Sequence, residues 1–149
     1  MTDAPQRAKA AWVDGWYVVP YDVLFRDVDA FGHVNNAVYF TFFEWARTQL
    51  WFAINGGRDP HDISFIVARA ECDFRRQIGM EPIDIRVRIG AMRGTSFDTL
   101  YEIVKTNGQQ LAATGKVVVV LYDWVKQEKV EISDALRRNV RAFQREAAE

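Results

Sequence analysis

The sequence predicts one α+β domain, in which an antiparallel β-sheet wraps around a long central helix. Three observations predict this fold. Thirteen of the eighteen residues at 37–54 are apolar, which is typical of a largely buried helix. The stretches that follow alternate apolar and charged residues with the period of a half-buried strand. A chain of 149 residues with 49% hydrophobic content can bury one full core but not two.

The composition also excludes several classes of function. A formal net charge of −1 gives no basic field, so we expect no nucleic-acid partner. No apolar run reaches the ~18 residues of a membrane span, and we expect no membrane segment. Residues 1–15 lack an apolar signal core, and the single cysteine, Cys72, excludes an internal disulfide. These features predict a cytoplasmic protein.

The N-terminal part of the chain is expected to hold an arm and a first strand. Residues 1–15 show no usable period, so we expect them to be extended or partly disordered, before a single domain at 16–149. Residues 16–26 are rich in Val, Tyr, Leu and Phe and predict a strand. Pro20 within it favours an edge position or a bulge.

The helix predicted at 37–54 has a start signal and a stop signal. Asn35 and Asn36 supply an N-cap, and Asn55-Gly56-Gly57 supplies a left-handed stop. Because it is so apolar, we expect it to be buried on nearly all sides. Glu44 is then expected to form an ion pair with Arg47, three residues further on.

The remainder of the chain predicts the rest of the sheet and a short helix. Strands are expected at 64–76, 82–93, 95–106 and 109–124. The last two flank Asn107-Gly108, which favours a two-residue hairpin turn. Residues 133–146 predict an amphipathic helix behind a Ser133 cap. Open edge strands favour pairing across a two-fold axis, so we expect a homodimer or homotetramer.

The loop before the helix carries the candidate site. It brings Asp27, Asp29, His33 and Asn36 to the helix N-terminus, where free N–H groups favour negative charge. Two aspartates at this spacing can bind a divalent metal, but no second cluster completes a shell, so we expect neither a metal nor a cofactor. Asp29 can alternatively cap its own turn, and His33 can be a turn residue satisfied by the backbone.

Outside the loop, the candidate groups have simpler interpretations. Cys72 lies on the inward face of its predicted strand without a basic neighbour, and we interpret it as a packing residue. Five arginines could bind a ligand phosphate or form a solvated face: Arg75, Arg76, Arg86, Arg88 and Arg93.

Residues 27–47, DVDAFGHVNNAVYFTFFEWAR, resemble the signature of hotdog-fold acyl-CoA thioesterases of the 4-hydroxybenzoyl-CoA thioesterase type. The pattern D-x-D-x-x-G-H-V-N-N-x-x-Y, followed by E-x-A-R, is matched at every position. The resemblance implies that Asp29 is the catalytic carboxylate, acting as nucleophile or as base on water. It also implies that the backbone N–H of Asn36 polarises the thioester carbonyl, and that Arg93 contacts CoA phosphates.

The resemblance extends to His33, with some departures. His33 matches a histidine of plant acyl-carrier thioesterases that assists catalysis, but Phe31 replaces the asparagine that those enzymes place between it and the aspartate. Asn36 and Phe25 stand where the Tol-Pal-cluster type has histidine and tyrosine. We expect the substrate to contact Phe31, Gly32, Tyr39, Arg76 and Arg93.

The leading hypothesis is therefore hydrolysis of an acyl-CoA to a free carboxylic acid and CoA. One alternative is an acyl-CoA hydratase on the same fold. Another is a non-catalytic acyl-CoA or fatty-acid binding protein, although a carboxylate such as Asp29 beside an apolar ligand would only add a desolvation cost. The sequence leaves open the acyl chain length, and the choice between aromatic and aliphatic substrates.

Overall fold

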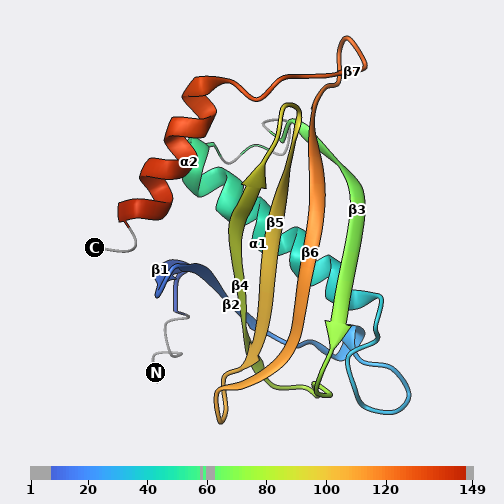
Figure 1. Ribbon diagram of the computed structural model, residues 1–149. Coiled ribbons are helices and arrows are strands. Elements are labelled where there is room, and N and C mark those ends of the chain that lie inside the picture. Colours follow the sequence, from blue (N-terminus) through green and yellow to red (C-terminus); the bar gives the residue numbers. More distant parts are fainter. Residues whose placement is uncertain (1–7, 58, 60–62, 147–149) are drawn as a thin grey trace.

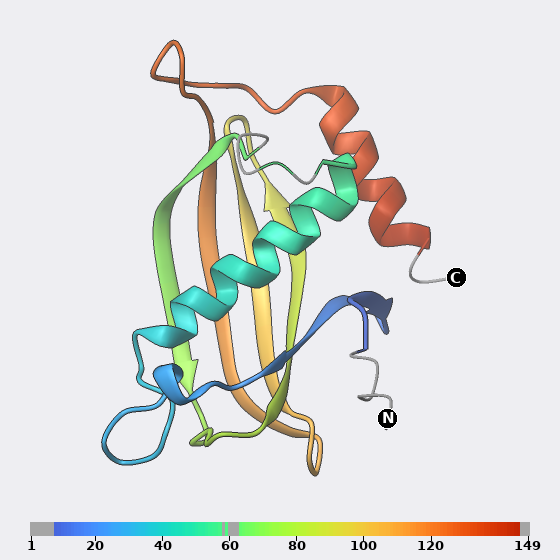
Figure 2. The same ribbon diagram turned by 180° about the vertical axis from the view of Figure 1, so that it is seen from behind.

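The computed structural model describes residues 8–57, 59 and 63–146. Its centre is a seven-stranded antiparallel sheet that curves around helix α1 (Val38–Asn55), as Figures 1 and 2 show from opposite sides. The strand order is β1-β2-β4-β5-β6-β3, and β7 pairs with β6. The α+β fold predicted from the sequence is confirmed.

The strands are β1 (Ala11–Val13), β2 (Trp16–Asp22), β3 (Phe65–Phe74), β4 (Pro82–Met92), β5 (Ser96–Lys105), β6 (Gln110–Asp123) and β7 (Glu128–Lys129). Strand β1 lies within the expected arm and pairs with β2, so ordered structure begins before residue 16. Strand β2 ends four residues earlier than predicted, and the 3-10 helix η1 (Phe25–Asp27) follows it. Pro20 lies in the part of β2 that pairs with β4 but not with β1, so one edge of β2 is open there.

Helix α1 covers the concave face of the sheet, but it is not buried on all sides. Its inward face places Tyr39, Phe42 and Phe43 in the core. On other faces, Phe40 is 38% exposed and Trp45 47% exposed. The prediction that α1 is buried on nearly all sides is therefore wrong for the single chain, because the sheet covers only one side of the helix.

Helix α1 packs closely against the sheet at Phe43. Its ring stacks on Tyr101 of β5, with centroids 4.2 Å apart. The space for this ring exists because the facing residue of β6 is Gly115, where an added Cβ would lie 2.4 Å from the Phe43 ring. Strand β6 thus carries a glycine where the Phe43 ring lies directly against its backbone.

Arg47 is buried at 5% exposure, and its partner is not the one predicted. Its Nη1 donates to the Tyr101 hydroxyl at 3.0 Å, and its guanidinium lies over the Phe65 ring. Glu44 is exposed, and within the described residues no ion pair joins it to Arg47. Arg47 points to Tyr101 in the core, whereas the Glu44 side chain is exposed to solvent, so the two do not meet although they are only three residues apart.

Strand β3 departs from the simple alternation predicted for it. A β-bulge shifts its register against β6 between Val67 and Arg69. Before the bulge, the odd position Phe65 packs against Trp51 of the helix. After it, the even position Phe74 packs against Tyr39. One extra residue reverses which positions face inward.

The β5–β6 connection is also longer than predicted. Lys105 pairs with Gln110, which leaves four loop residues, 106–109, instead of a two-residue turn at Asn107-Gly108. The left-handed conformations fall at Gly108 and Gln109.

Helix α2 (Asp134–Glu146) protects the edge of β4 beyond the end of β2. Gln144 receives a hydrogen bond from the Ile89 N–H and donates one to the Ile89 carbonyl, at 2.8 and 3.2 Å. Its side chain thereby replaces a neighbouring strand. The predicted cap is confirmed, since Ser133 Oγ accepts from the Leu136 N–H. Among the described residues no helix is long and apolar enough to cross a membrane.

Substitution Gly115→Ala is expected to lower the free energy of unfolding by about 1–3 kcal/mol, because the added methyl group must displace the Phe43 ring from Tyr101. Urea unfolding followed by circular dichroism measures the change. Gly94→Ala is the matched control, since nothing lies within 4 Å of a Cβ added there. Equal stability of the two variants would contradict the packing described for α1.

Candidate active site

The loop between η1 and α1 is a tight hairpin fixed by backbone hydrogen bonds. Val28 and Val34 form an isolated antiparallel bridge, and the Asp29 N–H donates to the His33 carbonyl at 2.9 Å. Gly32 adopts a left-handed φ of 81° and donates to the Asp29 carbonyl. The Val34 N–H donates to the Ile78 carbonyl, which fixes the loop to the segment between β3 and β4.

Asp29 has one carboxylate oxygen engaged and one available. Oδ1 accepts the N–H of Phe31 at 2.9 Å, so Asp29 does stabilise its own turn. Within the described residues, Oδ2 has no hydrogen-bond partner. The side chain is half-buried, which leaves it accessible from the pocket. The prediction that Asp29 caps its own turn is thus correct for Oδ1. This role leaves Oδ2 available.

Asp27 has a different environment, two residues away. It is 7% exposed, and its Oδ2 accepts hydrogen bonds from the Tyr21 hydroxyl at 2.8 Å and the Leu24 N–H at 2.9 Å. Burial, and then the hydrogen bond to Asp27, raise the pKa of Tyr21, so its hydroxyl stays a donor at neutral pH. Asp27 therefore fixes the chain before the loop and does not line the pocket.

The start of α1 differs from the predicted cap. The helix begins at Val38, and its N-cap residue, Ala37, makes no side-chain capping bond. Asn35 accounts for the preceding turn, because its Oδ1 accepts the Ala37 N–H at 3.0 Å. In the part of the chain that the structure describes, the Asn36 N–H donates to no protein acceptor. An unused donor therefore lies two residues before the helix.

These groups line one cavity of about 540 Å³. Six of the residues predicted for the site lie around it: Asp29, Phe31, His33, Asn36, Tyr39 and Arg76. Its other lining residues are Val34, Asn35, Phe74, Arg75 and Gln77. Phe74 and Gln77 were missed because they lie at the end of β3 and just after it, and only the fold places the end of that strand beside the start of α1 (Figure 1).

Two groups near the cavity remain protonated at neutral pH. Burial, and then the nearby Cys72, raise the pKa of Tyr39. Burial, and then Asp73, raise the pKa of the Cys72 thiol to about 11. Cys72 is therefore a neutral thiol, in agreement with its interpretation as a packing residue.

Arg75 and Arg76 give the cavity a basic rim. Both are exposed, and both backbone N–H groups donate to the Ala112 carbonyl, which fixes the turn after β3. Among the described residues, neither guanidinium makes an ion pair. Both are available for an anionic ligand.

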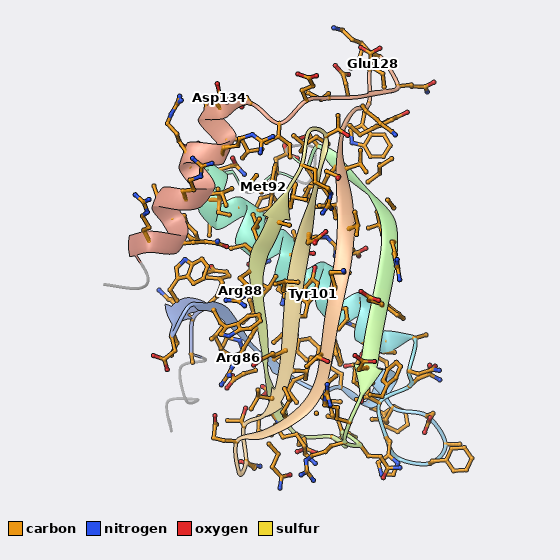
Figure 3. All side chains as sticks on the ribbon, viewed as in Figure 1. Arg86, Arg88, Met92, Tyr101, Glu128 and Asp134 are labelled. Carbon is orange, nitrogen blue, oxygen red and sulfur yellow. The ribbon has the colours of Figure 1, made fainter. Side chains whose placement is uncertain are left out.

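Two predicted substrate contacts are not in this cavity. Gly32 shapes the turn but does not line the cavity. Arg93 follows β4, whose other end adjoins the loop, and eleven residues of strand separate those ends by about 35 Å. Figure 3 labels the preceding residue, Met92, at the end of the sheet far from the loop. Arg93 instead binds Asp98 and Ser96, at 2.6 and 2.9 Å.

The described residues do not form a metal-binding site. No group of three or more His, Cys, Asp or Glu side chains among them could hold an ion. The Asp27 and Asp29 side chains make different contacts and do not form a joint site.

Comparison with known proteins identifies the family. The sequence profile of the thioesterase-like superfamily matches residues 23–140. The chain belongs to this superfamily. The match covers the loop, α1 and the sheet from the end of β2 onwards. The membership supports thioester hydrolysis as the reaction.

Individual relatives agree with this membership. An uncharacterized protein of Bacillus subtilis, YsmA, is 30% identical over 116 residues, covering 72% of this chain and 78% of that protein. A Thermus thermophilus thioesterase solved with coenzyme A and zinc has a TM-score of 0.78 and 29% identity, and the match covers 89% of this chain and 97% of that one.

A 4-hydroxybenzoyl-CoA thioesterase bound to 4-hydroxybenzoyl-CoA has a TM-score of 0.74 at 15% identity. The match covers 85% of this chain and 99% of that one. At this identity the likeness concerns the fold alone. The predicted hotdog fold is confirmed.

Loss of the Asp27 carboxylate is expected to affect stability more than chemistry. Asp27→Ala should lower the free energy of unfolding by about 2–3 kcal/mol, because the Tyr21 hydroxyl and the Leu24 N–H lose their acceptor. Tyr21→Phe, which removes one of the two bonds, should cost about 1 kcal/mol. Chemical unfolding measures both, and an Asp27→Ala protein as stable as the wild type would show that these bonds do not support the loop.

Proposed function

We propose that this member of the superfamily hydrolyses an acyl-CoA, and that Asp29 is its catalytic carboxylate. The observation that carries the proposal is the meeting of three features in one cavity. These are the available Oδ2 of Asp29, the unused Asn36 N–H and the positive end of α1. The Thermus thermophilus relative solved with coenzyme A supports an acyl-CoA as the substrate.

Two routes use the same carboxylate. As a base, Asp29 takes a proton from a water molecule that attacks the thioester carbonyl carbon. The tetrahedral intermediate then breaks its C–S bond, and the departing CoA thiolate takes that proton from Asp29. As a nucleophile, Asp29 attacks the carbonyl carbon itself, expels CoA and forms an anhydride that water cleaves. Both routes yield a free carboxylic acid and CoA.

The N–H of Asn36 is the proposed oxyanion donor in either route. Both routes place negative charge on the former carbonyl oxygen, and a fixed N–H at a helix start stabilises this charge more than it stabilises the neutral carbonyl. Tyr39, which remains protonated, offers a further donor from the first turn of α1. His33 lies in the same cavity and is assigned a supporting role, hydrogen bonding to the attacking water or the substrate.

The rest of the substrate has matching surroundings. Phe31 and Phe74 offer apolar contacts for the acyl group or the pantetheine arm. The unpaired guanidinium of Arg76 can bind a phosphate of CoA, and Arg75 beside it can do the same.

A dimer is part of the proposal, because β3 leaves one edge open. Within the described residues it pairs only with β6, although it is ten residues long and carries the exposed Val67. An open edge of this kind is commonly satisfied by a second copy across a two-fold axis. Such pairing is antiparallel, so the far end of one sheet meets the pocket end of the other. Arg93 of the second copy would then approach the pocket of the first copy, although it lies far from the pocket of its own chain.

Asp29→Asn is expected to lower kcat by about 10²-fold or more, the size typical of a lost general base. Thiol release measured over a panel of acyl-CoAs gives the rates. Asp27→Asn, the same substitution two residues away, is the control and should reduce kcat by less than about tenfold when assayed below its unfolding temperature. Near wild-type turnover by Asp29→Asn would refute the assignment.

The same panel separates the alternatives. Including 2-enoyl-CoAs distinguishes hydration, which removes the enoyl absorbance without releasing a thiol. Saturable binding without thiol release or hydration would indicate a carrier protein and would contradict the proposed hydrolysis.

A further inference from the structure

A second cavity, of about 610 Å³, lies at the end of α1 that is far from the Asp29 loop. Its lining residues from α1 and the turn after it are Gln49, Phe52, Ala53 and Gly56. The last three follow Gln49 by three, four and seven positions, so all four share one face of the helix. The lining also includes Lys9, which precedes β1, and Tyr17 of β2. The cavity therefore lies between the end of α1 and the N-terminal strands.

This cavity is separate from the one that contains Asp29. Strands β1 and β2 form the edge of the sheet opposite to β3, as Figure 2 shows. The two cavities share no lining residue, and Tyr39 and Gln49 stand ten residues apart on α1, about 15 Å along its axis. None of the described residues that line the second cavity is an acid, a His or a Cys. It therefore has the character of a binding site and has no counterpart of Asp29.

The polar side chains of this cavity are all hydrogen-bond donors. They are Lys9, Tyr17 and Gln49, and within the described residues none of these side chains has a hydrogen-bond or ion-pair partner. Burial raises the pKa of Tyr17, so its hydroxyl stays protonated at neutral pH. The ammonium, hydroxyl and amide groups can all donate to one acceptor group. Three available donors, one of them positively charged, favour a carboxylate as the group that they bind.

The helix dipole indicates where such a carboxylate would lie. The last carbonyls of α1 carry partial negative charge, which disfavours an anion beside Gly56. Gln49 lies seven residues earlier, about 10 Å along the axis, and the effect of the dipole falls off within the last turn. Strand β1 sets Ala11 opposite Val18, so the chain before Ala11 leads toward η1 and away from Gly56. Lys9 and Gln49 are therefore the groups best placed to hold the anion.

The other walls of the cavity are apolar and held in place. Phe52 and Ala53 form the wall on the helix. The Tyr17 ring packs against Trp12 and Phe143, with centroids 5.7 and 6.2 Å away. Nothing lies within 4 Å of a Cβ added at Gly56, so this side of the cavity is open. An apolar space with a few polar groups on its wall is typical of a small-molecule site.

We propose that this cavity binds an organic carboxylate with an apolar body, such as a medium-chain fatty acid. Lys9 and Gln49 bind the carboxylate, and Tyr17 adds a third donor. Phe52 and Ala53 contact the apolar chain, whose burial stabilises the complex. The site goes beyond the proposed hydrolysis and does not depend on it, although the acids that this reaction releases belong to the same chemical class.

Titration calorimetry with octanoate tests the chemistry of the ligand. Octanamide has the same chain and no charge, and it is the matched ligand. We expect octanoate to bind about tenfold more tightly, because a hydrogen bond to a charged acceptor is stronger than one to a neutral acceptor. Equal affinity for the two ligands would overturn the proposal, and so would the absence of binding at millimolar octanoate.

Substitutions in the cavity test its position. Ala53→Phe fills the space and should weaken octanoate binding by about tenfold or more. Lys9→Met and Gln49→Leu each remove one donor and should weaken it by about three- to tenfold. Lys129→Met, in β7, changes the net charge as Lys9→Met does and should leave the affinity unchanged. Octanoate binding that is unaffected by Ala53→Phe and Gln49→Leu would contradict this position.

Nuclear Overhauser effects between octanoate and the isotopically labelled wild-type protein locate the ligand without any substitution. We expect contacts from the octanoate chain to Phe52 and Ala53. Contacts to Tyr39 and Phe74 alone would place the ligand in the Asp29 cavity and overturn the proposal. Octanoate bound beside Phe52 in a protein that hydrolyses no acyl-CoA would refute the proposed function and retain this second site.

Discussion

The packing of α1 against the sheet at Phe43 is the constraint on which the rest of the structure depends. The ring occupies the space above Gly115 and stacks on Tyr101, so neither rotation of the helix nor a shift along its axis is free. Arg47 adds a second contact to the same tyrosine, one turn further on. Because the helix position is fixed, the position of its first residue is fixed too. The loop before it is then held at the end of β3.

The loop itself separates two similar carboxylates into different roles. Asp27 is buried and bonded by Tyr21, whereas Asp29 keeps one oxygen open to the cavity. The difference follows from the turn that begins at Asp29 and is closed by Gly32. The carboxylate proposed for catalysis is thus supported by a rigid backbone, and the hydrogen bond from the Phe31 N–H holds its Oδ1 and leaves Oδ2 available.

The sequence predicts those features that depend on local patterns. The long helix, the alternation of β4 and the grouping of Asp29 with His33 at the helix start all follow from residues close together in the chain. The bulge before Arg69 does not, since it reverses the inward positions without a change in composition. The partner of Arg47 was also missed, because Tyr101 lies 54 residues away and only the tertiary fold joins them. Family resemblance suggested Arg93 as a substrate contact, but the fold places it at the end of β4 far from the cavity, where it binds Asp98 and Ser96.

The account is tested most directly by a crystal structure with a non-hydrolysable ketone analogue of the acyl-CoA that is hydrolysed fastest. A methylene group between the sulfur and the carbonyl preserves the carbonyl oxygen and prevents cleavage. We expect this oxygen about 3 Å from the Asn36 N–H, and the Asp29 carboxylate about 3–3.5 Å from the carbonyl carbon. A carbonyl bound elsewhere, such as the cavity beside Tyr17 and Phe52 at the other end of α1, would contradict the account.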